Sequence, residues 1–129
     1  MNYEVTDNSM KRKVERWLRD NDSCYTFDDI MDGIEKGHFQ THLFGDTWVL
    51  TSIHDWPQRR SVHIDLVVGK VLETIKLDSS RVAEEVCDWA QSVGADLVTG
   101  SGRPGWGRVR PEGWRITGYN FSKDLRNGQ

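Results

Sequence analysis

The chain has 129 residues, of which 29% are charged, and its formal net charge is -3. This length suits one domain with its own hydrophobic core, so we expect a single domain over residues 1–129. The small negative charge excludes a nucleic-acid binder that works by bulk charge, and it excludes an acidic solvating tail.

Targeting signals and cysteines bear on where the protein works. No apolar run approaches the roughly 20 residues of a membrane span, and the N-terminus lacks the basic and apolar regions of a signal peptide. Cys24 and Cys87 lie far apart, and Cys87 falls on the apolar side of a predicted helix, which favours a buried free thiol over a disulfide. We therefore expect a soluble protein in a reducing compartment, without membrane contact.

Two helices are predicted in the first third of the chain. Met10, Val14 and Leu18 share one helical face with Trp17, behind a cap at Asn8 or Ser9. A second helix spans about residues 26–36, because Thr26 and the two aspartates after it resemble a capping box and Gly37 is a stop signal.

From residue 39 the spacing of apolar residues changes from a helical to an alternating, strand-like pattern. Residues 39–44 and 47–53 predict two strands around a Gly45-Asp46 turn, and residues 61–68 predict a third after a loop. The third strand is almost continuously apolar, which indicates a central strand covered on both faces.

The last part of the chain predicts a crossover. Residues 79–93 repeat apolar side chains at helical spacing, Gly94 ends the run, and residues 95–99 form a short strand. A helix between two neighbouring strands favours parallel, right-handed pairing. A glycine- and arginine-rich turn, a short helix and a final strand over residues 115–121 would follow. The predicted class is α/β, with a mixed central sheet flanked by helices.

This order resembles the GNAT (GCN5-related N-acetyltransferase) superfamily from about Met10 to Leu125. More narrowly, it is similar to small GNAT-like proteins encoded by tailed bacteriophages. The residues that carry the narrower likeness are TSIHDWPQRR at 51–60, CDWA at 87–90 and GRPGWGRV at 102–109. The resemblance implies a single GNAT-like domain located in the host cytoplasm, the virion or both.

The resemblance also implies where acetyl-CoA would bind. Members carry an arginine or glutamine followed by glycines before the crossover helix, where backbone N–H groups hold the pyrophosphate. Here that place holds Val68, Gly69 and Lys70, with a single glycine, so the loop is degraded or absent. The tyrosine that protonates the leaving thiolate in many members falls at Val109, and valine cannot donate a proton. We expect either no cofactor or, in an active enzyme, acetyl-CoA held by Val68, Gly69 and Lys70.

A general base is easier to nominate. His63 and Asp65 lie two residues apart on the predicted central strand, so they share one face, and His54 lies on the strand before. A histidine that titrates near neutral pH could deprotonate an ammonium through water. A hydrogen-bonded structural pair accounts for His63 and Asp65 as well, and we favour it because no cofactor loop accompanies them.

Metal binding is not expected. His38 and His42 are four residues apart, which suits a metal only on a helix, and they fall at the turn and strand after the second helix.

Two segments are candidates for contact with a partner. Trp56 lies at a hairpin tip beside Arg59 and Arg60, and an exposed tryptophan with arginines is typical of an interface anchor. Arg103, Trp106 and Arg108 form the second segment. They could stack on bases and bind phosphates, but the net negative charge favours tryptophans that fill the end of the core and arginines that are solvated or paired.

Two functions follow from these patterns. The sequence favours a bacteriophage GNAT-like protein with a degenerate acetyl-CoA site, acting as a virion-associated or assembly protein, either minor structural or internal, whose partners are other phage proteins. The alternative is an active N-acyltransferase that moves an acetyl group from acetyl-CoA to an amine, with His63 and Asp65 as catalytic residues. A third hypothesis, a small inhibitor of a host protein, stays open.

Overall fold

A computed structural model describes residues 8–20, 23–45, 47–68, 75–100, 113–118 and 122–126. Two helices come first, α1 (Asn8–Asp20) and α2 (Phe27–Glu35). A meander of three strands follows, β1 (Gln40–Phe44), β2 (Thr47–Asp55) and β3 (Arg60–Val68), and then α3 (Ile75–Ser92) and β4 (Leu97–Gly100). This order agrees with the one expected from the sequence.

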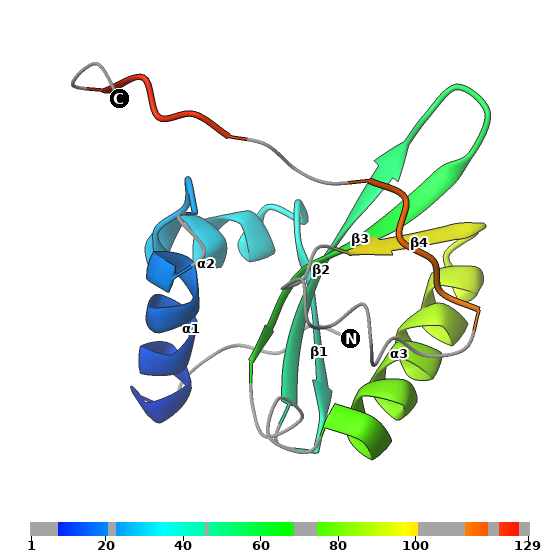
Figure 1. Cartoon of the computed structure of the whole chain (residues 1–129), viewed down its shortest axis with the longest axis horizontal. Coiled ribbons are helices and arrows are strands. Elements are labelled where there is room, and N and C mark those ends of the chain that lie inside the picture. The colour runs from blue at the N-terminus through cyan, green and yellow to red at the C-terminus, as the bar shows by residue number, and fades with distance from the viewer. Residues whose placement is uncertain are drawn as a thin grey trace.

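The four strands form one mixed sheet in the order β1-β2-β3-β4. β2 pairs antiparallel with β1 and β3, whereas β3 and β4 pair in parallel across the α3 crossover. Helices α1 and α2 lie on one face of the sheet and α3 lies on the other (Figure 1). The predicted α/β class, with a mixed central sheet flanked by helices, is confirmed.

Each face of the sheet has its own core. The first core packs Val14, Leu18, Ile30 and Ile34 of α1 and α2 against alternate residues of the sheet, which are Trp48, Leu50, Leu66 and Val68. The second packs Val86 and Ala90 of α3 against the opposite face, at Val49 and Val62. β3 contributes to both cores, as its apolar sequence predicts.

Local signals set the ends of α2. The Thr26 hydroxyl accepts a hydrogen bond from the Asp29 amide at 3.2 Å, and the Asp29 carboxylate accepts one from the Thr26 amide at 2.8 Å. This reciprocal pair satisfies amides that the helix itself leaves open. After the helix, Gly37 takes φ +80°, a conformation that glycine adopts without steric cost. The capping-box prediction is confirmed.

A β-bulge interrupts the pairing of β2 and β3. Leu50 lies opposite Leu66 and Thr51 lies opposite Ile64, so Asp65 is the extra residue on β3. A bulge breaks the alternation of side chains between the two faces. Asp65 and the adjacent Leu66 consequently line the same pocket under α1 and α2.

Some expectations at the C-terminal end were wrong. Residues 115–118 form no strand, and their side chains are exposed, Ile116 by 56%, so no neighbouring strand buries them. The rest of that predicted strand, residues 119–121, lies outside the described residues, as does the expected short helix. α3 begins at Ile75, four residues before the predicted start at Ser79.

The cysteines are free, as expected, but Cys87 is half-buried rather than buried. Partial burial, with help from the neighbouring Asp88 and Glu84 carboxylates, raises the pKa of the Cys87 thiol. No helix within the described ranges is long and apolar enough to cross a membrane.

His42 is a core residue and not part of a metal pair. It lies on β1, with 6% of its surface exposed, and its Nε2 shares a 2.9 Å hydrogen bond with the Thr51 hydroxyl. The ring edge of His42 packs on Trp89 with centroids 4.4 Å apart, while His38 is exposed at the turn. Among the described residues, no group of three or more His, Cys, Asp or Glu side chains could hold a metal ion.

Gly33 supports the contact between α2 and Phe39. A Cβ at position 33 would lie 2.5 and 2.7 Å from two ring carbons of Phe39, which is itself buried. Alanine normally stabilises a helix relative to glycine by about 1 kcal/mol. We expect Gly33→Ala instead to lower the free energy of unfolding by about 1–3 kcal/mol, because the ring must move in a packed core. Urea unfolding measures the change.

The control for this prediction is a double variant. Phe39→Leu removes the ring that Gly33→Ala would strike, so the two changes together should cost less than the sum of the single changes. Additive costs, or a stabilised Gly33→Ala protein, would contradict the proposed clash.

The burial of His42 predicts a dependence of stability on pH. Burial lowers the pKa of His42 to about 4, from an ordinary value of 6.5. The unfolded chain therefore takes up a proton as the pH falls below about 6.5, and the folded chain does so only near pH 4. Between these values the free energy of unfolding should fall by ~1.4 kcal/mol per pH unit because of this residue.

His42→Gln isolates that contribution, since glutamine does not titrate and its amide can still bond Thr51. Urea unfolding at pH 7, 5.5 and 4.5 should show a shallower loss of stability in the variant than in the wild type. Equal pH dependence in both proteins would mean that His42 titrates normally in the folded state.

Candidate functional site

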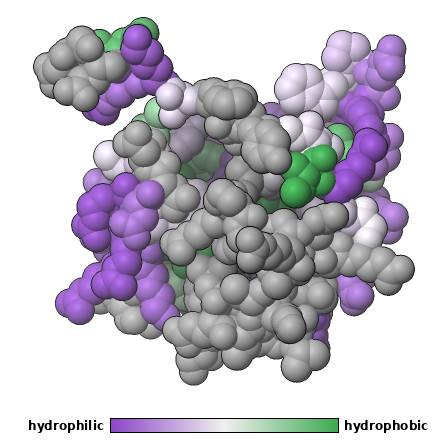
Figure 2. Space-filling model, in the orientation of Figure 1, coloured by the Kyte–Doolittle hydropathy of each residue, from purple (hydrophilic) through white to green (hydrophobic). Residues whose placement is uncertain are grey.

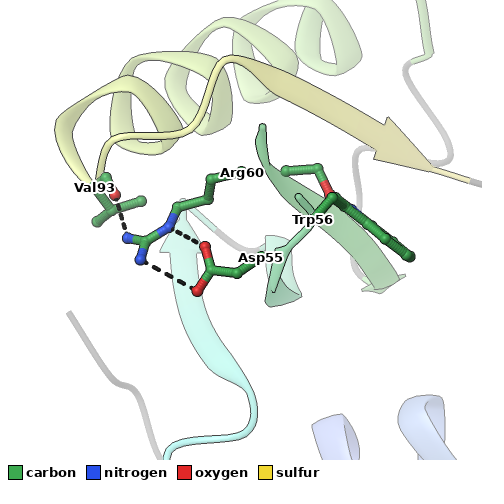
Figure 3. Close-up of polar contacts among 5 residues, drawn as sticks. Asp55, Trp56, Arg60 and Val93 are labelled. Atoms are coloured by element: carbon green, nitrogen blue, oxygen red, sulfur yellow. Dashed lines mark hydrogen bonds and ion pairs between the residues drawn. The ribbon is translucent and has the colours of Figure 1, made fainter. Parts of the chain in front are cut away.

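The hairpin between β2 and β3 is held in shape by an arginine. Arg60 donates to both carboxylate oxygens of Asp55, from Nε at 2.6 Å and from Nη2 at 3.3 Å. Its Nη1 also donates to the carbonyl oxygen of Val93 at 2.8 Å, just after α3 (Figure 3). One guanidinium thus joins both sides of the hairpin to the end of a helix on the sheet face opposite α1 and α2.

Trp56 is presented at the tip of this hairpin. It is 58% exposed, and its side chain points away from the Arg60 cluster in Figure 3. Its backbone N–H donates to the Arg59 carbonyl at 2.9 Å, and its indole N–H donates to the Ser61 hydroxyl at 2.9 Å. The ring stacks beside His54 with centroids 6.0 Å apart. Both N–H groups of Trp56 are satisfied within the chain, and its apolar ring remains accessible.

Arg59 also bonds within the chain. Its Nε lies 3.1 Å from Asp96 Oδ1, and its Nη2 donates to the Asp96 carbonyl at 3.2 Å. The arginines that the sequence nominated for partner contact therefore brace the hairpin, while their side chains stay 46% and 41% exposed. The other nominated partner residues, Arg103, Trp106 and Arg108, lie outside the described residues.

A polar cluster lies on the sheet next to the hairpin. His63 Nδ1 shares a 2.7 Å hydrogen bond with the Thr99 hydroxyl across the parallel pair, and Ser52 Oγ shares one of 2.9 Å with His54 Nε2. The rings of His54 and His63 meet edge to face with centroids 6.4 Å apart. His63 bonds to Thr99 and not to Asp65, so the expected direct pair is replaced by a cross-strand bond. Ser52 and Thr99 were not foreseen, because only the strand register shows that they lie beside these histidines.

Asp65 is the half-buried acid of this cluster. Burial raises its pKa, and this is opposed by a hydrogen bond from Ser52 and by the charges of His63 and His54. Its Oδ2 atom is buried and has no hydrogen-bond partner among the residues that the structure describes. A buried carboxylate oxygen without a partner costs free energy.

Asp65 borders a pocket between the two N-terminal helices and the sheet. The pocket has a volume of about 160 Å³. Its walls include three aromatic and two aliphatic side chains, which are Trp17, Tyr25, Phe39, Leu50 and Leu66. Ser52 stands between Asp65 and the exposed His54, and its hydroxyl shares the 2.9 Å hydrogen bond with His54 Nε2.

Of the three residues nominated for cofactor binding, the structure describes one. Val68 is 3% exposed and packs in the first core, so its side chain is not available to a ligand. Gly69 and Lys70 lie outside the described residues.

The exposed surface around these features is mainly hydrophilic, with a hydrophobic patch beside the hairpin (Figure 2). Figure 2 shows mainly hydrophilic side chains along the outside of α1 and toward the end of the hairpin. Trp56 is thus a large, apolar ring in polar surroundings, the pattern of a central anchor with a polar rim.

Comparison with known proteins identifies the fold. No protein-family model and no curated protein sequence matches the chain. One solved structure, a GNAT family acetyltransferase from Staphylococcus aureus subsp. aureus USA300_TCH1516, is similar with a TM-score of 0.61. The match covers 97% of this chain and 96% of that one, at 10% sequence identity. At this identity the likeness concerns the architecture alone, and the chain has a GNAT-like fold.

Proposed function

We propose that this chain is a GNAT-like protein of a tailed bacteriophage with a degenerate acetyl-CoA site, and that it acts as a virion-associated or assembly protein. In this role the fold is a scaffold, and the β2–β3 hairpin docks on another phage protein. The observation that carries the docking proposal is the exposure of Trp56 on a braced hairpin.

The hairpin is preorganised for binding. Ordering a flexible side chain or loop on binding costs free energy, and a segment that is already ordered avoids most of that cost. The Asp55–Arg60–Val93 bonds hold the hairpin, and the Ser61 hydroxyl holds the indole. Tryptophan and arginine are also the residues most enriched among those that dominate binding energy at interfaces.

The position of the hairpin suits this role. It projects beyond the helices on both faces of the sheet, so a partner can reach Trp56 without approaching α1 or α3 (Figure 1). Arg59 and Asp96 lie beside it as an exposed ion pair. Such a pair contributes little to folding stability and can exchange partners at a polar rim.

A degenerate cofactor site supports a scaffold role. The sequence between β3 and α3 carries one glycine, and the resemblance puts Val109 where members have the proton-donating tyrosine. His63, the nominated base, is already bonded to Thr99. We propose that the protein in its native role works without a cofactor.

One observation favours the alternative, an N-acyltransferase. Asp65, Ser52 and His54 follow one another from the pocket under α1 and α2 to the exposed surface of the sheet, and polar side chains in such a row can help a general base to release a proton. In an active enzyme Asp65 would take the proton from the amine and His54 would pass it to water. Acetyl-CoA would supply the acetyl group, with Gly69 and Lys70 nearest its pyrophosphate.

Trp56→Ala tests the docking role. Loss of an exposed ring should change the free energy of unfolding by no more than about 1 kcal/mol, since it removes one hydrogen bond. Incorporation into phage particles should fall sharply, because removing such an anchor typically weakens binding by about 2 kcal/mol or more. Quantitative immunoblotting of purified particles from a complemented phage measures the copies incorporated.

Leu125→Ala is the matched control, because Leu125 is 79% exposed and belongs to the C-terminal segment, which lies on the other side of the molecule from the hairpin (Figure 1). It should be incorporated like the wild type. Normal incorporation of the Trp56→Ala protein, or absence of the wild-type protein from particles together with normal assembly, would rule out the docking proposal.

Calorimetric titration with acetyl-CoA separates the two functions. For the scaffold, no binding is expected at millimolar ligand, and the thermal unfolding midpoint should not rise, since a ligand that binds only the folded state would raise it. A micromolar Kd would contradict the degenerate site and favour the acyltransferase. In that case Asp65→Asn should lower acetyl transfer far more than it lowers acetyl-CoA affinity.

A further inference from the structure

The pocket beneath α1 and α2 is large enough for a small ligand. Its volume is about 160 Å³. An engineered cavity of about 150 Å³ is known to admit a molecule the size of benzene. Tyr25, which is 52% exposed, lies at the pocket and also on the protein surface, so the pocket is accessible from outside.

The pocket combines one carboxylate with three aromatic rings. Asp65 is the charged side chain in its wall, and the bulge in β3 turns it toward the pocket beside Leu66. Trp17, Tyr25 and Phe39 supply the rings, with Tyr25 and Phe39 edge to face at 5.7 Å. The faces of such rings attract cations, most strongly where water is excluded.

The unpartnered oxygen of Asp65 adds a second, independent indication. Oδ2 is buried and has no hydrogen-bond partner within the described part of the chain. A negative charge in an apolar pocket is stabilised by a cation close to it. A cationic ligand in the pocket would compensate the Asp65 charge through space, because Oδ2 itself is covered and offers no surface for direct contact.

We propose that this pocket binds a small quaternary ammonium group, with the Asp65 carboxylate as its counter-charge and the rings of Trp17, Tyr25 and Phe39 against its methyl groups.

The shortage of hydrogen-bond acceptors favours a methylated ammonium over a primary one. A primary ammonium carries three N–H donors, which need acceptors when they leave water. Besides Asp65, the side-chain acceptors in the described pocket wall are two hydroxyls: that of Ser23, which already accepts from the Tyr25 amide at 3.1 Å, and that of the half-exposed Tyr25. A quaternary nitrogen has no donor to satisfy, and its methyl groups suit aromatic and aliphatic walls. It has no lone pair and cannot accept an acetyl group, so this site is one of recognition and goes beyond the proposed docking role.

Calorimetry with three probes tests the proposal. Choline carries the quaternary ammonium, 3,3-dimethylbutan-1-ol is its neutral carbon counterpart of the same size, and ethanolamine is its smaller primary-ammonium counterpart, without the three methyl groups. Choline should bind with a Kd in the millimolar range or below, and each of the others should bind at least about tenfold more weakly. Equal binding of the neutral alcohol would reduce the site to an apolar pocket and overturn the proposal. Equal or tighter binding of ethanolamine would overturn it in favour of a primary amine.

Two variants test whether choline binds in this pocket. Asp65→Asn keeps the shape of the side chain and removes its charge, so choline affinity should fall at least about tenfold. Asp28→Asn makes the same change at an exposed site in α2, outside the pocket, and should bind choline like the wild type. Circular dichroism and thermal unfolding establish that both variants fold.

Tyr25→Leu provides a test that does not depend on the half-buried acid. Tyr25 is half-exposed, so its replacement should preserve the fold while it weakens choline binding severalfold. Undiminished choline affinity in either Tyr25→Leu or folded Asp65→Asn would overturn the proposal.

Discussion

The burial of β3 on both faces is the constraint on which the rest of the structure depends. β3 pairs with β2 on one side and with β4 on the other, and it contributes side chains to both hydrophobic cores. Helices on both faces are needed to cover a strand of this kind. The parallel pairing with β4 in turn requires a crossover, which α3 provides.

The same strand carries the polar residues. His63 meets Thr99 on β4, and Asp65 stands at the bulge opposite the junction of Leu50 and Thr51. The first core does not extend to the hairpin. Followed from Val68 back to Arg60, β3 first packs in this core, then carries the polar residues Asp65 and His63, and ends at the ion pair of Arg60 with Asp55. One strand thus has an apolar end, a polar middle and an end in the hairpin. The polar residues and the hairpin, which lie outside the core, are the candidate functional sites.

Much of the fold could be predicted from local patterns. Helical spacing in α1, the Thr26 and Asp29 box and the apolar run of β3 each depend on residues close in sequence, and each is found in the structure. The site depends on contacts between distant residues. The bulge at Asp65, the His63–Thr99 bond and the Arg60–Val93 bond all arise from strand register and helix placement, which no short sequence pattern contains. The strand predicted at residues 115–118 is the opposite case, because a local pattern predicted an element that is not formed. A strand-like sequence becomes a strand only where a neighbouring strand pairs with it and buries it.

The bond from Arg60 to the Val93 carbonyl has a mechanical consequence. It places a positive charge at the C-terminal end of α3, where the helix dipole is negative, and it does so from the strand pair of Asp55 and Arg60 that closes the hairpin loop. A force applied at the hairpin tip would therefore not bend two strands alone. Part of the force would pass into the sheet through the hydrogen bonds between β2 and β3, and part would pass into α3 through the Arg60–Val93 bond. The hairpin should therefore resist bending more than two paired strands alone would.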